Sequence, residues 1–144
     1  MRKIGLDVGD KTVGIAVSDP LGITAQGVTT LERIGIRKDT TRIVEMVVEK
    51  ECDTVVVGLP LSLNGSDSEQ TRKVRDFFTM LSNKLVSMGH KDVDVVWQDE
   101  RLTTVQAEKI LIEGDVRRKD RKKVIDKQAA VLILQTYLDS HPEK

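Results

Sequence analysis

Acidic residues at three widely separated places in the chain could together hold metal ions. They are Asp7 near the amino terminus, the neighbouring pair Asp99 and Glu100, and Asp126. Carboxylate oxygens are hard ligands that suit hard divalent cations such as Mg²⁺ or Mn²⁺. Two such cations about 4 Å apart can activate a water and stabilise the leaving oxygen of a phosphoryl displacement. The acids therefore indicate metal-assisted phosphoryl chemistry, provided that the fold brings them together.

The sequence offers little for other common kinds of catalysis. Its two histidines, His90 and His141, lie in an expected loop and in the carboxyl-terminal tail, and Cys52 is the only cysteine. This scarcity argues against a zinc site built from nitrogen and sulfur ligands. It also argues against a histidine base or a Cys-His nucleophile.

Asp7 lies in the first of two short β-type runs, residues 3–8 and 13–18, which a turn at 9–12 would join into a hairpin. Side chains alternate between the two faces of a strand. One face of the hairpin carries large apolar residues, namely Ile4, Leu6, Val8, Val13, Ile15 and Val17. The other face carries Gly5, Gly14, Ala16 and Ser18 around Asp7. We interpret this small-residue face as a floor for a substrate backbone; the alternative is an edge hairpin with a solvated Asp.

The other acids also lie at positions where a sheet could present them. Asp99 and Glu100 follow a predicted strand at 93–97, and ligands of open α/β sheets bind beyond the carboxyl ends of strands. Asp126 lies in a predicted helix, 124–138, on a stripe with three core-type residues, Ala130, Ile133 and Tyr137. An acid on the first turn of such a stripe either exploits the positive helix terminus or pairs with a cation at the sheet edge.

The remaining elements must position these acids. The patterns predict an extended segment at 23–31, a helix at 38–50, a strand at 54–57, a helix whose apolar stripe runs from Val74 to Met88, and a helix at 103–113. This order predicts an α/β fold. Its sheet is mixed and five-stranded, with three antiparallel strands, then two parallel ones, and helices on both faces. A chain of 144 residues is expected to form a single domain over 1–144.

Charge and hydropathy limit the kinds of partner that the chain is expected to bind. The 23 basic and 23 acidic side chains balance, so affinity for nucleic acid must be local. The stretch 117–123 holds six positive residues in seven, and it could clamp phosphates or form a solvated loop or helix face. No apolar run approaches the roughly 20 residues of a membrane span. The lone cysteine and the acidic residue near the amino terminus favour the cytoplasm.

Four blocks, in order, resemble the YqgF family, whose members are described as Holliday junction resolvases and as pre-16S rRNA nucleases. The first block is Gly5 to Gly9 with Val13 to Asp19, and the second is Val57 to Pro60 with Asn64-Gly65. The third and fourth are Asp99 to Thr104 and Asp126 to Gln135. The resemblance spans essentially the whole chain, and four ordered blocks are far more specific than any one of them.

The resemblance implies a ribonuclease H-like fold and a nuclease dependent on Mg²⁺ or Mn²⁺. It implies Asp7, Glu100 and Asp126 as catalytic and metal-binding residues, with Asp99 as the alternative middle acid. With one Trp, one Tyr and two Phe, the chain has few rings for base stacking, so we expect a nucleic-acid partner recognised through its backbone. The oligomeric state, a monomer or a homodimer, stays open.

The substrate implied first is pre-16S rRNA, processed at its 5′ end in ribosome biogenesis. The alternatives are a Holliday junction resolvase acting on branched DNA and a non-catalytic nucleic-acid adaptor. An ATP-binding protein of the actin and sugar-kinase type has a similar first hairpin. Such proteins use two domains of this kind, and this chain is too short for both.

Overall fold

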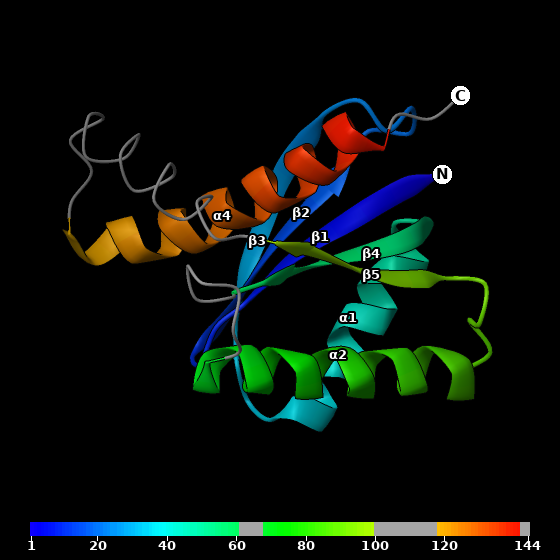
Figure 1. Ribbon diagram of the computed structural model, residues 1–144, viewed down its shortest axis with the longest axis horizontal. Helices are drawn as coiled ribbons and strands as arrows, with labels where there is room; N and C mark the ends of the chain where they lie inside the picture. The colour runs from blue at the N-terminus through cyan, green and yellow to red at the C-terminus, as the bar shows by residue number, and fades with distance from the viewer. Residues whose placement is uncertain (61–67, 100–117, 142–144) are drawn as a thin grey trace.

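The computed structural model describes residues 1–60, 68–99 and 118–141, with the backbone alone for 118–127. In chain order the elements are β1 (Arg2–Val8), β2 (Thr12–Ser18), β3 (Ala25–Glu32), α1 (Ile36–Glu49), β4 (Cys52–Leu59), α2 (Glu69–Ser87), β5 (Asp94–Asp99) and α4 (Arg118–Ser140) (Figure 1). Within these ranges no helix combines the length and apolar character that crossing a membrane requires.

The five strands form one sheet in the order β3-β2-β1-β4-β5. β1 pairs antiparallel with β2, and β2 pairs antiparallel with β3. On its other side β1 pairs parallel with β4, which pairs parallel with β5. The prediction of three antiparallel and two parallel strands is confirmed. The carboxyl ends of β1, β3, β4 and β5 therefore share one edge of the sheet, called here the carboxyl edge.

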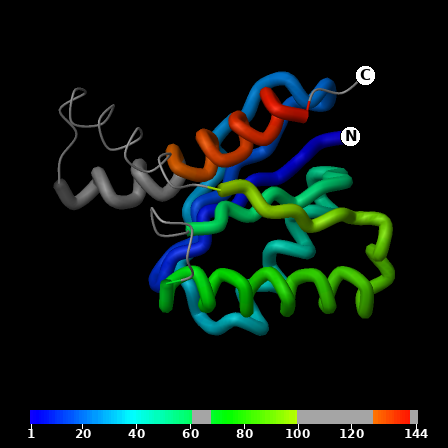
Figure 2. Tube along the Cα trace, viewed as in Figure 1, coloured from blue at the N-terminus to red at the C-terminus, as the bar shows by residue number. Residues whose placement is uncertain are grey.

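Helices cover both faces of the sheet, as predicted: α1 and α2 lie on one face and α4 lies on the other (Figure 2). The face toward α1 and α2 is packed with large apolar side chains. Its buried core includes Ile4, Leu6, Ile15, Val55 and Val57 from the strands, with Ile43, Phe77 and Leu81 from the helices.

The α4 face is built differently, because small residues let the helix approach the strands closely. A Cβ placed on Gly5 would lie 2.7 Å from the Cβ of Leu134 and 3.1 Å from the carbonyl oxygen of Ala130. Ala16, the β2 partner of Gly5, is fully buried in the same cluster. The prediction of an open floor for substrate is therefore wrong at Gly5 and Ala16, since α4 occupies that surface.

Most predicted boundaries lie within two residues of the observed ones. The strand predicted at 54–57 is longer, and the last helix begins at Arg118 rather than at 124. Nearly all of the basic stretch 117–123 is thus helical, because Lys and Arg are good helix formers. The predicted helix at 103–113 lies outside the described residues.

Candidate active site

Asp7 lies at the carboxyl edge, on the central strand of the sheet. It is half-buried, and it pairs with Gly14 across the antiparallel ladder between β1 and β2. It comes one residue after Leu6, which pairs with Val57 of β4. Because side chains alternate, Asp7 shares the α4 face with Gly5, two residues earlier in β1. The carboxylate therefore lies beyond the contact between Gly5 and α4.

The turn that follows Asp7 is held from two sides. The Gln70 side-chain amide, from the first turn of α2, donates to the Val8 carbonyl oxygen at 3.2 Å. The Arg33 guanidinium donates through Nη1 to the Gly9 carbonyl oxygen at 2.9 Å. These contacts fix the backbone within two residues of Asp7.

The start of α2 is itself fixed to the same edge. Ser68 caps the helix, and its side chain and that of Thr71 form a reciprocal capping box. The buried Thr71 hydroxyl also donates to the carbonyl oxygen of Pro60, the residue after β4. Lys73, one turn into α2, forms an ion pair with Asp10 in the turn, with Nζ and Oδ1 3.3 Å apart. α2 therefore links the ends of β1 and β4.

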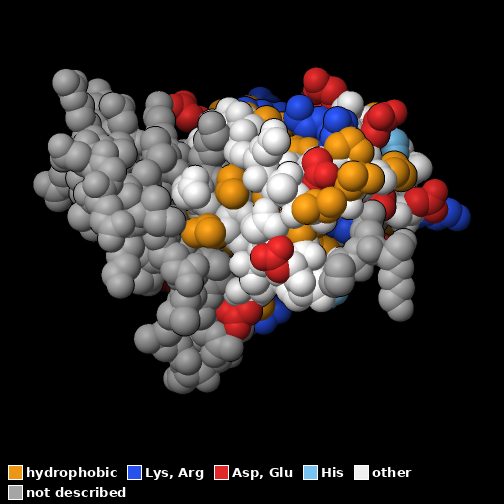
Figure 3. Space-filling view, turned by 90° about the horizontal axis from the view of Figure 1, so that it is seen from above, with side chains coloured by type: hydrophobic (Ala, Val, Ile, Leu, Met, Phe, Trp, Pro, Cys, Tyr) orange, Lys and Arg blue, Asp and Glu red, His pale blue; other side chains and the backbone are white. Residues whose placement is uncertain are grey.

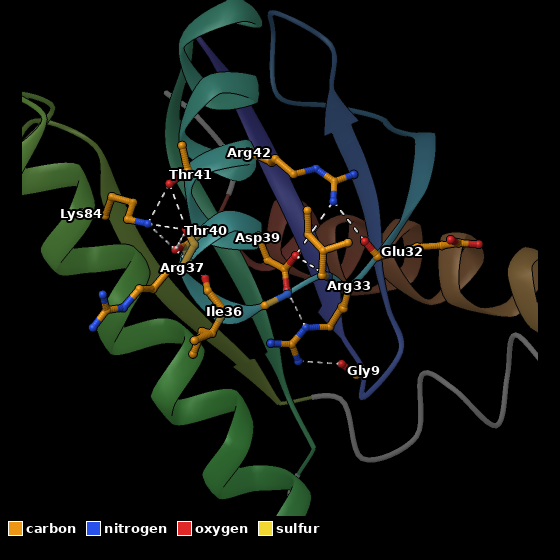
Figure 4. A network of polar contacts seen from close by, with 12 residues as sticks. Gly9, Glu32, Arg33, Ile36, Arg37, Asp39, Thr40, Thr41, Arg42 and Lys84 are labelled. Atoms are coloured by element: carbon orange, nitrogen blue, oxygen red, sulfur yellow. Dashed lines mark hydrogen bonds and ion pairs between the residues drawn. The ribbon is translucent and has the colours of Figure 1, made fainter.

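Arg33 is held in turn by a buried carboxylate (Figure 4). Asp39 is only 3% exposed, and its Oδ2 accepts from Arg33 Nε at 3.0 Å. Its Oδ1 accepts from the Ile34 N–H at 3.0 Å. Burial raises the pKa of the Asp39 carboxyl, but hydrogen bonds from Ile34, Arg33 and Gly35 outweigh it, so the pKa lies below its ordinary value. Asp39 stays ionised at neutral pH and orients Arg33.

The sequence patterns do not predict this arrangement. A signal was present, because Asp39 shares a helical stripe with Ile43 and Val47, four and eight residues further on. An acid on a core-facing stripe needs a partner, but nothing local identifies Arg33 as that partner.

Of the pair of acids at the end of β5, the structure describes one. Asp99 ends β5 and pairs with Leu59. Trp97, two residues earlier, pairs with Val57 and packs against the core under α1 and α2. By alternation Asp99 belongs to that face, opposite to the face of Asp7. Glu100 lies outside the described residues.

Asp126 lies in the third turn of α4, and the structure describes its backbone alone. α4 runs in roughly the opposite direction to β1 (Figure 1). The Ala130 carbonyl oxygen lies against Gly5, and Asp126 precedes Ala130 by one helical turn. The helix thus continues from Gly5 toward the end of β1 that carries Asp7.

The described side chains offer little of what metal, thiolate or histidine chemistry would require. No three His, Cys, Asp or Glu residues among them form a group that could hold a metal ion. Burial raises the pKa of the Cys52 thiol to about 11, so it does not form a thiolate nucleophile at neutral pH. His141 stacks on Tyr137 at the end of α4, with ring centroids 4.2 Å apart.

The whole architecture matches solved nucleases. The chain aligns with Thermus thermophilus RuvC in complex with a Holliday junction substrate at a TM-score of 0.61 and 17% identity, covering 100% of this chain and 98% of that one. It aligns with the fowlpox virus Holliday junction resolvase at a TM-score of 0.58 and 12% identity, covering 97% and 99%. These likenesses confirm the predicted ribonuclease H-like fold.

Relatives of known name are much more similar in sequence. A protein of Clostridium tetani is 48% identical, covering 97% of each chain, and one of Lactococcus lactis is 50% identical, covering 99% of this chain and 97% of the relative. Both carry the name "Putative pre-16S rRNA nuclease".

A family model described as RuvX, Holliday junction resolvase, matches residues 1–140. Together with the named relatives, it confirms the predicted enzyme class, a nuclease that hydrolyses phosphodiester bonds. The chain belongs to the RuvX family of Holliday junction resolvases.

Proposed function

We propose that this nuclease uses Mg²⁺ or Mn²⁺ and that its metal-binding and catalytic acids are Asp7, Glu100 and Asp126. The observation that carries the proposal is the place of Asp7, half-buried on the central strand at the edge where β4 and β5 also end. Glu100 directly follows β5, and α4 continues from Gly5 toward the same edge.

The bounds of α4 support the choice of Asp126. A helix terminus stabilises an acid only within its first turn, and Asp126 follows the first residue of α4, Arg118, by eight positions. The helix-terminus explanation therefore does not apply. We propose a cation near the edge of the sheet as the partner of this acid.

The register of β5 supports Glu100 as the middle acid. Asp99 belongs to the face toward α1 and α2, whereas Asp7 belongs to the α4 face. A cation held by Asp7 would therefore lie across the sheet from Asp99. The residue after Asp99 is Glu100, and successive residues of an extended chain face opposite sides of a sheet.

The three acids fit a hard divalent cation, because they offer oxygen ligands alone. Such cations, when bound, activate the attacking water and stabilise the leaving oxygen of the displaced phosphodiester. The role of the protein is to hold the carboxylates in fixed positions. The Gln70 and Arg33 contacts to the turn keep the Asp7 backbone in place. The half-burial of Asp7 strengthens its attraction for a cation relative to bulk water.

We propose pre-16S rRNA as the substrate, processed at its 5′ end in ribosome biogenesis. Relatives 48% and 50% identical over nearly their whole length carry the name "Putative pre-16S rRNA nuclease". A Holliday junction is the second candidate, because the matching family is described as a Holliday junction resolvase. Trimming an RNA end suits a monomer, whereas cutting two strands of a junction suits a symmetric dimer. We further propose that residues 1–144 form a single domain that works in the cytoplasm.

The test incubates the pure protein with a pre-16S rRNA precursor and with a four-way DNA junction, in Mg²⁺, in Mn²⁺ and in chelator. We expect metal-dependent cleavage of the RNA and no cleavage in chelator. Cleavage of the junction alone would favour the resolvase. Binding of either substrate without cleavage in any metal would favour the non-catalytic adaptor.

Substitution of the acids tests their roles. We expect Asp7→Asn and Asp126→Asn each to lower the cleavage rate more than about 100-fold, because changing a group behind a metal ligand alone costs 10- to 100-fold. Asp94→Asn is the matched control, since Asp94 is exposed at the opposite end of β5. Asp99→Asn should also retain activity. Unchanged rates in both folded Asp7 and Asp126 variants would refute the assignment.

A further inference from the structure

A pocket of about 380 Å³ lies beside the first turns of α1, apart from the acids of the proposed site. Its lining consists of Ile34, Arg37, Lys38, Thr41, Arg42 and Lys84. Four of these six residues are cationic, and none is acidic. We call it the α1 pocket.

The positive charge of the α1 pocket is only partly balanced by neighbouring acids. One nearby carboxylate is that of Asp39, which is 3% exposed and bonded to Arg33 at 3.0 Å, and another is that of the exposed Glu32, whose backbone carbonyl accepts from Arg42 at 3.0 Å. Arg42 Nη1 lies 3.9 Å from Asp39 Oδ1. Arg37 and Lys38 are exposed, and neither forms an ion pair with a carboxylate of the described residues. The pocket therefore presents net positive charge to the solvent.

Lys84 makes the wall of the α1 pocket rigid (Figure 4). This residue of α2 donates from Nζ to the hydroxyl oxygens of Thr40 at 2.9 Å and Thr41 at 2.8 Å, and also to the Arg37 carbonyl oxygen. The three contacts join α2 to the first two turns of α1. Rigid placement lowers the conformational entropy that is lost when a ligand binds.

The α1 pocket begins beside the carboxyl edge, where α1 starts, and extends away from it to Lys84 in the last turn of α2. β3 runs parallel to β1, because both are antiparallel to β2, so α1 begins where β1 ends. Ile34 of the pocket directly follows Arg33, which donates to the carbonyl oxygen of Gly9. The chain distance from Gly9 to Asp7 is two residues. A long nucleic acid that wraps around this edge, from Asp7 on the α4 face to the first turn of α1 on the other face, can therefore meet both the site and the pocket.

The described part of the α4 face carries side chains of mixed character. There hydrophobic side chains lie among acidic, basic and uncharged ones (Figure 3).

Arg37 can contact two phosphate oxygens at once through its planar guanidinium, and Lys38 adds a point charge beside it.

We propose that the α1 pocket binds phosphate groups of the nucleic-acid backbone outside the linkage that is cut. The choice of ligand rests on the proposed nuclease function. Because the contacts are to phosphates, the pocket serves RNA and DNA alike and carries no sequence preference.

The test measures binding in chelator, so that cleavage plays no part. Affinities for a fluorescent pre-16S rRNA fragment and for a four-way DNA junction are measured over a range of salt concentrations. The variant is Arg37→Gln with Lys38→Gln. The matched control is Lys50→Gln with Lys91→Gln, because these residues precede β4 and β5 at the opposite edge. Circular dichroism verifies that both variants fold.

Each lost phosphate contact should lower the slope of log affinity against log salt by about 0.7 to 0.9. We expect the Arg37 and Lys38 variant to lose about 1.4 to 1.8 of slope with both ligands, and the control to match the wild type. A slope equal to that of the wild type overturns the inference, as does a wild type that binds neither ligand.

The outcomes separate this inference from the nuclease proposal. If the wild type cleaves nothing in any metal but the slope falls as expected, the α1 pocket stands and the catalytic proposal fails. If cleavage is intact and the slope is unchanged, the reverse holds.

Discussion

On one face of the sheet large aliphatic side chains meet α1 and α2, whereas on the other face a glycine lets α4 approach the strands closely. Neighbouring residues of β1 show the contrast. Leu6 is fully buried in the core under α1 and α2. Gly5 lies so close to α4 that an added Cβ would come 2.7 Å from Leu134. On the first face large side chains determine the distance between the helices and the sheet. On the second face the absence of a side chain at Gly5 lets α4 lie close to the strands.

The difference bears on catalysis, because Asp7 belongs to the α4 face. A helix that lies directly on the backbone of β1 is placed with little freedom relative to that strand. The α1 and α2 face can instead adjust through many side chains. The close face therefore suits a site whose acids come from both β1 and α4.

The largest expected effect is a truncation on the face with large side chains. Leu6→Ala should lower the free energy of unfolding by about 4 kcal/mol, because it leaves a cavity at the centre of the sheet. Urea unfolding measures the loss. A loss below about 1 kcal/mol would mean that this face is packed loosely.

A larger side chain on the α4 face should lower the free energy of unfolding almost as much. Gly5→Ala forces a methyl group against Leu134 and the Ala130 backbone, and we expect a loss of about 3 kcal/mol. The folded variant should also cleave more slowly, since α4 moves relative to Asp7. Val17→Ile adds one carbon at the margin of the opposite face, where the residue is 8% exposed, and should cost less than about 1 kcal/mol. Equal losses in the two variants would remove the distinction between the faces.

A smaller effect is expected at Asp39, a buried acid on the α1 side. Asp39→Asn should lower the free energy of unfolding by about 2 kcal/mol, because hydrogen bonds from Arg33 and Ile34 to a charged acceptor are lost. Glu45→Gln on the same helix is the control, since Glu45 is exposed. A loss as small as that of the control would mean that the ion pair contributes no stability.

The same acid predicts a dependence on pH. Its pKa in the folded chain is lower than its ordinary value of about 3.9. The folded state therefore binds the proton less readily, and the stabilisation is complete above about pH 4 and lost as the pH falls below it. The difference in unfolding free energy between wild type and Asp39→Asn should shrink from pH 7 to pH 3. A constant difference would assign the effect to packing alone.

Local patterns predicted the strands and their antiparallel or parallel character, because alternation in 3–8 and 13–18 and the apolar run near 54–57 are determined by burial. They did not predict what lies on Gly5 and Ala16. Small residues fit a closely packed helix and a bound substrate equally well. The distinction depends on α4, which is more than 100 residues away in the sequence.

The acids on helical stripes show the same limit. Asp39 and Asp126 each share a stripe with buried apolar residues, yet Asp39 forms an ion pair with Arg33. The stripe signals a buried partner without naming it. For Asp126 the start of α4 at Arg118 argues against the helix-terminus explanation, and the basic run alone did not predict that start.

The central place of β1 has a consequence for motion. β1 is hydrogen-bonded to β2 on one side and to β4 on the other, whereas β3 and β5 lie at the ends of the strand order. Fraying and local opening begin at such edges, and central strands exchange their amide hydrogens only when the whole fold opens. The backbone under Asp7 should therefore be among the last to exchange with deuterium. Thermal inactivation should then follow global unfolding, because we expect no local opening of lower free energy to displace this acid.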